Sequence, residues 1–202
     1  MAFLLGLTGN IACGKSTVGR LLTERYAADY IDADQVVHER YAAGTPETQA
    51  IAARFGADLL REDGTIDRRR LGDKVLGNQA ALKDLEGILD PGVRRAIEAR
   101  IASSSAPVVV LDAVRLIEGG LYERCDAVWV LVCGRQAQLE RLQATRNFST
   151  EQAALRVDSQ PPIESKLRHA TAVLTNDSSV ADLEAQIEAA FRRDVRPRLD
   201  AV

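Results

Sequence analysis

The sequence predicts an α/β protein whose core is a five-stranded parallel sheet flanked by helices, and two observations support this. Five short apolar segments are typical of strands, and helical segments separate them; they span residues 3–8, 30–32, 108–112, 127–132 and 172–175. Strands that alternate with helices form a parallel sheet with helices on both faces. A glycine-rich segment also follows the first strand and opens a helix, as in folds that bind ligands at the carboxyl ends of their strands.

The glycine-rich segment is the most informative part of the chain. Residues 9–17 fit G-x-x-x-x-G-K-[ST], the pattern of a phosphate-binding P-loop. Glycines allow a tight turn whose backbone N–H groups converge on an anion, while Lys15 can reach the β- and γ-phosphates and the Ser16 hydroxyl can bind Mg²⁺. Apolar residues at helical spacing follow, from Val18 to Tyr26. We therefore expect a P-loop NTPase core whose ATP-binding residues include Asn10, Ile11, Ala12, Cys13, Gly14, Lys15, Ser16 and Thr17.

Composition limits the other possibilities. The 202 residues suffice for one α/β core with insertions, and 46% hydrophobic with 27% charged residues is ordinary for a globular protein. A net charge of −3 argues against a general nucleic-acid or membrane-surface binder, and no apolar run reaches the roughly 18 residues of a membrane span. We expect no signal peptide and no obligate protein partner.

The cysteines indicate a reducing compartment. There are three, at positions 13, 125 and 133, with no C-x-x-C pair and no histidine at ligand spacing, so we expect a cytoplasmic protein. Cys13 stands just before a predicted helix, where a thiol can have a lowered pKa; the alternative is that it only fills a position for a small residue.

The uneven spacing of the strands predicts two insertions. Residues 41–104 form a helical substrate-binding insertion, with helices opening at Thr45-Pro46 and Asp67-Arg68 and a break at Asp90-Pro91. Residues 141–169 form a lid rich in arginine, with a capping box at 149–152, although a solvated charged face would look the same. The nucleotide-binding core comprises 1–40, 105–140 and 170–202.

The core closes with a C-terminal helix. Val180, Leu183, Ile187 and Phe191 follow at helical spacing, and we expect this helix to pack on the sheet through all four residues.

The motifs that accompany the P-loop distinguish between classes of P-loop protein. A GTPase needs N/T-K-x-D after a late strand, but residues 175–178 read Thr-Asn-Asp-Ser, without lysine. A small chain with a helical insertion and a lid fits a kinase of small molecules. Such an enzyme needs a carboxylate that accepts the proton of the substrate hydroxyl.

Two aspartates after the second strand are candidates for that base. We expect only one of Asp32 and Asp34 to act as the base, and Asp34 is the better candidate because it lies further toward the loop. The alternative is that the pair forms a turn or caps the next helix. Asp112, which closes the third strand, is typical of a carboxylate that holds Mg²⁺.

Taken together, these residues resemble the dephospho-coenzyme A kinase family over most of the chain. The resemblance includes residues 6–11 entering the P-loop, Ile31-Asp32-Ala33-Asp34, Phe55-Gly56, residues 63–68, Leu116-Ile117-Glu118 before Leu121-Tyr122, residues 138–142, Arg146, residues 154–160 and Asn176. It implies a nucleotide core, a coenzyme A domain and a lid. It also implies transfer of the γ-phosphate of ATP, with Mg²⁺, to the ribose 3′-hydroxyl of dephospho-coenzyme A.

The resemblance assigns roles to several residues. Lys15, Asp34 and Arg146 are the expected catalytic residues, with Asp34 the base and Arg146 in the lid, and Asn176 lies beside the adenine. Ser16 and Asp112 are the expected metal ligands. The expected substrate-binding residues are Asp34, Phe55, Arg68, Arg115 and Glu118.

Two departures from the family pattern concern the substrate side. The family usually has His-Pro where this chain has Asp90-Pro91, and Leu-Leu where it has Arg115-Leu116 after Val114 in its Asp-x-Pro-Leu-Leu-x-Glu motif. Because an arginine is costly to bury unless it is paired, we expect Arg115 to pair with an anionic group of the substrate or with a nearby carboxylate such as Glu118 or Asp90. Two alternatives remain open: a kinase of another small alcohol or a nucleoside monophosphate, and a nucleotide-binding regulatory protein without turnover.

Overall fold

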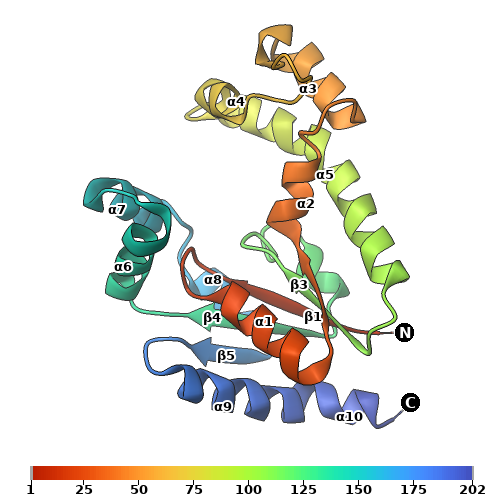
Figure 1. Cartoon of the computed structure of the whole chain (residues 1–202), viewed down its shortest axis with the longest axis vertical. Coiled ribbons are helices and arrows are strands. Elements are labelled where there is room, and N and C mark those ends of the chain that lie inside the picture. The colour runs from red at the N-terminus through yellow and green to blue at the C-terminus, as the bar shows by residue number, and fades with distance from the viewer. Residues whose placement is uncertain (1, 202) are drawn as a thin grey trace. The chain divides into compact units, whose positions relative to one another are not determined.

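The computed structural model describes residues 2–201 and contains the expected sheet (Figure 1). Its strands lie in the order β2-β3-β1-β4-β5, and the pairs β1–β3, β1–β4 and β4–β5 are parallel. The sequence prediction of a five-stranded parallel sheet is thereby confirmed. The strands are β1 (Phe3–Gly9), β2 (Asp29–Asp32), β3 (Val108–Asp112), β4 (Ala127–Val132) and β5 (Ala172–Thr175).

Helices connect the strands, and many begin at the cap that the sequence indicates. Thr45 caps α3, Asp67 caps α4, and Ser149 forms a complete capping box with Gln152 at the start of α7. The α-helices are α1 (Lys15–Tyr26), α2 (Ala33–Glu39), α3 (Pro46–Phe55), α4 (Arg68–Val75), α5 (Gln79–Ser103), α6 (Arg135–Arg146), α7 (Thr150–Asp158), α8 (Glu164–Leu167), α9 (Val180–Ala190) and α10 (Arg196–Leu199).

The chain divides into two compact units. The first comprises Met1–Ile31 and Ser104–Val202 and contains the sheet; the second comprises Asp32–Ser103 and contains α2 to α5. The second unit begins at Asp32, nine residues before the predicted start of the insertion at residue 41, because it also includes α2. Along residues 2–201, no helix combines the length and apolar character that crossing a membrane requires.

The core of the first unit lies against one face of the sheet. Alternate residues of the central strands, among them Leu5, Leu7 and Trp129, are fully buried there together with side chains of α1 and α9. Leu183 and Ile187 of α9 join this cluster, but Val180 is 56% exposed. The expectation that Val180 packs on the sheet is therefore wrong, because the first turn of α9 extends beyond the apolar cluster.

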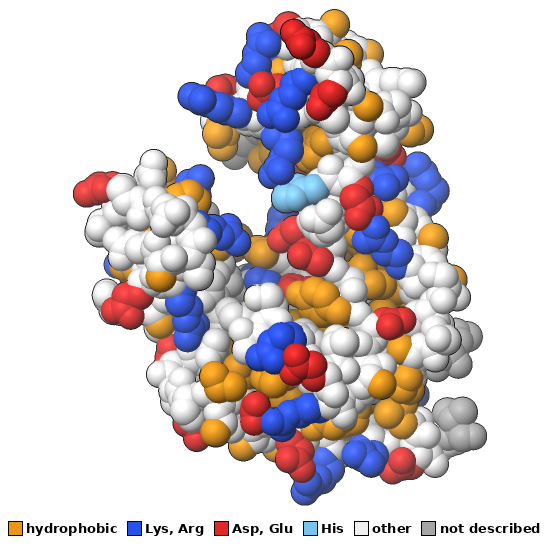
Figure 2. All heavy atoms as spheres, in the orientation of Figure 1, with side chains coloured by type: hydrophobic (Ala, Val, Ile, Leu, Met, Phe, Trp, Pro, Cys, Tyr) orange, Lys and Arg blue, Asp and Glu red, His pale blue; other side chains and the backbone are white. Residues whose placement is uncertain are grey.

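The second unit has an apolar core of its own. Ile51, Leu71, Leu85 and Leu89 are buried in one cluster, which holds α3 and α4 against α5. Its surface carries exposed cations along α4, and Figure 2 shows Lys and Arg side chains gathered over this helix.

The break predicted at Asp90-Pro91 is wrong. The helix α5 runs without interruption through Pro91 for 25 residues. Proline removes one backbone hydrogen bond and crowds the carbonyl four residues earlier. Here Leu89 and Val93 are buried on either side of Pro91, while Pro91 itself is exposed. Burial of the apolar face on both sides of the proline therefore outweighs its local cost.

Candidate active site

The P-loop connects the end of β1 to the start of α1. Steric constraints explain why two of its positions are glycine. Gly9 has φ +149°, and a Cβ there would lie 2.3 Å from the Leu131 carbonyl oxygen of the neighbouring strand. Gly14 has φ +97° and a Cβ there would lie 2.3 Å from the Asn176 amide nitrogen. Both positions combine an unfavourable φ with lack of space, so neither tolerates a side chain. The loop must pass this close to β4 and to the segment after β5.

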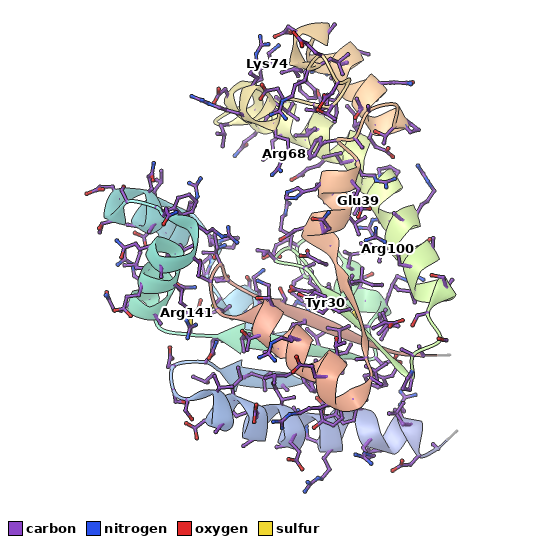
Figure 3. All side chains as sticks on the ribbon, in the orientation of Figure 1. Tyr30, Glu39, Arg68, Lys74, Arg100 and Arg141 are labelled. Atoms are coloured by element: carbon purple, nitrogen blue, oxygen red, sulfur yellow. The ribbon has the colours of Figure 1, made fainter. Side chains whose placement is uncertain are left out.

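Three side chains hold the loop by its carbonyl oxygens. Gln138 Nε2 donates to the Ile11 carbonyl at 3.0 Å, Arg141 Nη1 donates to the Ala12 carbonyl at 3.2 Å, and Asn176 Nδ2 donates to the Cys13 carbonyl at 2.8 Å. Arg141, labelled in Figure 3, also donates through Nη2 to the Asn176 carbonyl at 2.7 Å, which ties two of the three together.

This arrangement orients the N–H groups of the loop. In a trans peptide the N–H points away from the carbonyl of the same unit. Because the carbonyls at 11, 12 and 13 are held by these side chains, the N–H groups at 12, 13 and 14 point away from them, and the N–H of Cys13 makes a long turn contact of 3.4 Å to the Asn10 carbonyl. Successive N–H groups turned to one side form an anion-binding concavity. Gln138 and Arg141 were not predicted in this role, although Gln138 is 6% exposed, an unusual burial for a helical glutamine.

Lys15 and Ser16 lie at the N-terminus of α1, directly after the P-loop glycine Gly14. Lys15 is the first residue of α1, and its Nζ donates to the Gly9 carbonyl at 3.2 Å, which folds the side chain back over its own loop. Ser16 is exposed in the first turn of the same helix. The ammonium and the helix N-terminus both favour a negatively charged ligand here.

The predicted lid segment touches the P-loop. Ile11 N–H donates to Gln160 Oε1 at 2.8 Å, and Ile11 and Ala12 pack against the apolar cluster formed by α6 and α7. Arg146 is exposed at the last position of α6, where Asn147 adopts the left-handed conformation that ends the helix. Movement of α6 and α7 would therefore shift the P-loop through these contacts.

Asp112 meets the chemical requirements of a magnesium ligand. It ends β3, it is 7% exposed, and its partner in the adjacent β1 is Leu7, two residues before the P-loop begins at Gly9. The Tyr30 hydroxyl donates to its Oδ2, which fixes the carboxylate from β2 (Figure 3). Magnesium prefers oxygen ligands and keeps several waters, so a carboxylate and a serine hydroxyl suit it without further acidic residues. Residues 2–201 indeed contain no group of three or more His, Cys, Asp or Glu able to hold a metal.

Glu118 is held by a buried lysine. Lys166 on α8 is 1% exposed, and its Nζ donates to both carboxylate oxygens of Glu118, at 2.6 and 2.9 Å, and to the Val114 carbonyl at 2.7 Å. Burial alone would raise the pKa of Glu118, but the hydrogen bond and charge of Lys166 reverse this and lower it. The contact fixes the segment after β3 to the end of the lid and was not predicted from sequence.

Arg115 adds its charge to the same segment. Its positive charge also lowers the pKa of Glu118. Arg115 is exposed, so the cost of burial does not constrain its partner, and the expected pairing stays a prediction.

The remaining predicted residues lie in the second unit. Asp34 is in the first turn of α2, and Asp32 is the cap whose Oδ1 accepts from the N–H groups of Asp34 and Gln35. The structure thus takes the capping alternative at Asp32, and the helix begins at Ala33, so that Asp34 lies within it. Phe55 ends α3 against the apolar cluster, and Arg68 is exposed at the start of α4.

Comparison with known proteins identifies the family. A family model for dephospho-CoA kinase (CoaE) matches residues 3–182. The chain belongs to the dephospho-CoA kinase family. A dephospho-CoA kinase from Geobacter sulfurreducens is 41% identical over 188 residues, covering 92% of this chain and 95% of that protein.

Solved structures agree with this family. The crystal structure of TT1252 from Thermus thermophilus matches with a TM-score of 0.82 and 30% identity, covering 95% of this chain and 97% of that one. A dephospho-CoA kinase from Campylobacter jejuni matches with a TM-score of 0.69 and 28% identity, covering 98% of this chain and all of that one (100%). The sequence-based assignment to a P-loop small-molecule kinase is confirmed.

Proposed function

We propose that this protein transfers the γ-phosphoryl group of ATP to the ribose 3′-hydroxyl of dephospho-coenzyme A, giving coenzyme A and ADP. The observation that carries this proposal is the P-loop, whose carbonyls are held from outside by Gln138, Arg141 and Asn176 in a chain of the dephospho-CoA kinase family. A preorganised set of N–H donors stabilises the charge on the phosphates without reorganisation during transfer.

Five residues of the first unit act on the nucleotide or its metal ion in this proposal. Lys15 leaves the Gly9 carbonyl and contacts the β- and γ-phosphates, which compete better than a neutral carbonyl for an ammonium. Ser16 and Asp112 would hold Mg²⁺, which neutralises phosphate charge when bound. Tyr30 keeps the Asp112 carboxylate in place through its hydroxyl. Asn176 is assigned to the adenine side, in addition to its bond to the P-loop.

Asp34 is assigned as the base that accepts the proton of the 3′-hydroxyl. It follows β2 by two residues, and the carboxyl ends of strands are where ligands gather in such sheets. It lies in the first turn of α2, where a helix N-terminus favours a negatively charged side chain. Arg146 is assigned to the lid, where its planar guanidinium can pair with phosphate oxygens when the lid closes.

The substrate side is assigned to Phe55, Arg68, Arg115 and Glu118. Arg68 is an exposed cation at the start of α4, suited to the phosphates of dephospho-coenzyme A, and Phe55 offers an aromatic ring. Glu118 acts with Lys166, which occupies both of its oxygens, so in this proposal it shapes the segment that carries Arg115. The enzyme is proposed to work in the cytoplasm, without nucleic acid, membrane or an obligate protein partner.

One assay separates this proposal from its alternatives. ADP release is measured with ATP alone and with dephospho-coenzyme A or a series of nucleoside monophosphates and small alcohols as acceptors. We expect turnover only with dephospho-coenzyme A, and its loss in Lys15→Ala. Faster turnover with a nucleoside monophosphate would identify a different kinase, and ATP binding without turnover on any acceptor would indicate a regulatory protein.

A further inference from the structure

Two cysteines far apart in the sequence meet beneath the P-loop. The Sγ atoms of Cys13 and Cys133 are 3.4 Å apart, although 120 residues separate them. Cys13 belongs to the P-loop and is 2% exposed, whereas Cys133 directly follows β4 and is half-buried. The pairing of β1 with β4, with Gly9 opposite Leu131, brings the two segments together. The sulfurs are thus in van der Waals contact at the ATP site.

The surroundings of this pair differ from those of the third cysteine. The Gln138 amide donates to Cys13 Sγ at 3.3 Å, and the Ala12 carbonyl lies 4.0 Å from Cys133 Sγ. Cys125 has the Leu121 carbonyl at 3.6 Å, and burial raises its pKa to about 12. Cys125 is therefore a protonated thiol at neutral pH and serves as an internal control.

The pair shares one proton at neutral pH. The hydrogen bond from Cys133 lowers the pKa of Cys13 to about 6 against the opposing effect of burial, with smaller contributions from Gln138 and the charge of Lys15. The same bond and burial raise the pKa of Cys133. One sulfur is thus a thiolate in contact with a thiol, which is the arrangement from which disulfides form.

We propose that Cys13 and Cys133 form a reversible disulfide that ties the P-loop to the end of β4 and weakens ATP binding. The oxidant class is a hydroperoxide. The Cys13 thiolate attacks the peroxide oxygen, breaking the O–O bond to give a sulfenic acid and hydroxide. Cys133 then loses its proton to that hydroxide and attacks Cys13 Sγ, which expels a second hydroxide that solvent protonates. With hydrogen peroxide, a thiol and a thiolate yield one disulfide, one water and one hydroxide.

The bridge must distort the anion-binding loop. Sulfur atoms in a disulfide are about 2.05 Å apart, so the two must approach by roughly 1.3 Å. Cys13 lies between Ala12 at φ +59° and Gly14 at φ +97°, two residues in conformations that leave little freedom to absorb a shift. The approach also removes the Gln138 bond to Cys13 Sγ. The N–H groups at 13 and 14 therefore turn away from the phosphates.

The predicted loss of ATP binding rests on the proposed function of the P-loop as the ATP site. The predicted formation of the disulfide does not. The full-length protein, first reduced, is treated with hydrogen peroxide; free thiols are then alkylated under denaturing conditions and the peptides are analysed by mass spectrometry. We expect a peptide pair bridged through Cys13 and Cys133, while Cys125 is alkylated. Absence of this bridge, or a bridge that includes Cys125, would overturn the proposal.

The effect on the nucleotide is measured by titration calorimetry with ATP before and after oxidation. We expect the Kd for ATP to rise by about tenfold or more, equivalent to about 1.4 kcal/mol, and to recover with dithiothreitol. Cys133→Ser should form no bridge and keep its ATP affinity after peroxide, and Cys125→Ser should behave as the wild type. A mapped bridge with unchanged Kd would overturn the regulatory role, whereas failure of the reduced protein to bind ATP would instead refute the proposed function.

Discussion

Lys166 offers the sharpest test of the interactions that hold the site together. It is the most deeply buried charged side chain of residues 2–201, and it makes three hydrogen bonds, two to Glu118 and one to the Val114 carbonyl. Lys166→Met keeps the length and removes the charge, which leaves a carboxylate and a carbonyl without this donor. We expect the free energy of unfolding to fall substantially.

The magnitude follows from the burial of each partner. Breaking a fully buried ion pair costs about 3–5 kcal/mol. The Glu118 side chain is 25% exposed and regains some solvation, so we expect a cost at or just below the lower limit of this range, about 2–3 kcal/mol. Lys74→Met is the matched control, because Lys74 pairs with Asp58 in an exposed site and its pair should contribute less than about 1 kcal/mol. The double variant Lys166→Met/Glu118→Gln should lose about 1–2 kcal/mol less than the sum of the two single changes.

The assay is urea unfolding followed by fluorescence of Trp129, which is the single tryptophan of the chain and is fully buried. A loss of less than about 1 kcal/mol in Lys166→Met, or the same loss in Lys74→Met, would refute the reasoning.

The pH dependence gives a second reading of the same pair. The pKa of Glu118 is lowered in the folded protein from its ordinary value of 4.5. A lowered folded pKa contributes stability that is present above the unfolded pKa and lost as the pH falls through the folded pKa. The difference in stability between wild type and Lys166→Met should therefore be full at neutral pH and shrink in acid below about pH 4.5. A difference that is constant with pH would contradict the assignment.

Four further changes test the catalytic assignments and one local strain. Lys15→Ala should lower kcat by on the order of 10²-fold or more, because phosphoryl transfer depends on positioning and charge, and near-normal turnover would refute the role of the P-loop lysine. Asp34→Asn should lower kcat by roughly 10²–10⁴-fold with ATP affinity unchanged; an equal loss of ATP binding would assign Asp34 to the metal instead. Arg146→Lys should reduce turnover because the planar fork is lost, and full activity would make Arg146 a solvated residue. Ala27 ends α1 at φ +51°, so Ala27→Gly should raise stability by about 0.5–1 kcal/mol, with a smaller gain for Asn147→Gly as control, both measured by urea unfolding.

The sheet could be predicted because its signal is local and strong. Strands buried on both faces appear as continuous apolar runs, and Val108–Asp112, for example, is buried at every position and was predicted with the correct bounds. Helix starts at Thr45, Asp67 and Ser149 were predictable for the same reason, since a cap needs only residues within one turn.

The sequence was undecided where two local signals competed, and its prediction was wrong where packing overrode a local signal. Asp32 and Asp34 look alike as residues after a strand, but only the hydrogen bonds of Asp32 to the backbone decide that the helix begins between them. Pro91 is a helix breaker by local rules, and only the burial of Leu89 and Val93 explains why α5 continues. Neither the neighbours of α5 nor their contacts are visible in the sequence around residue 90.

The candidate site likewise has one part that could be predicted from local sequence and one part that could not. The P-loop is a local motif, but the side chains that orient it come from positions 127, 129 and 163 residues further along the chain. From the sequence, Arg141 is only the first residue of an arginine-rich lid and part of the family-like segment 138–142, and Asn176 is only expected beside the adenine. Their shared function follows from the order of the sheet, because β4 lies next to β1 and β5 next to β4, so that α6 and the segment after β5 both follow strands that end near the loop.

The same topology explains why the P-loop is ordered and why the proposed disulfide would affect it. A glycine-rich loop has little conformational preference of its own, so its N–H groups converge only if something else fixes its carbonyls. Those contacts bring the end of β4 against the loop, and with it Cys133 against Cys13. A change at that contact alters Cys13 within the loop and so reaches the phosphate site directly. If the carbonyl contacts hold the loop, Arg141→Ala should weaken ATP binding, and unchanged binding in that variant would show that the Arg141 contact is not needed to hold it.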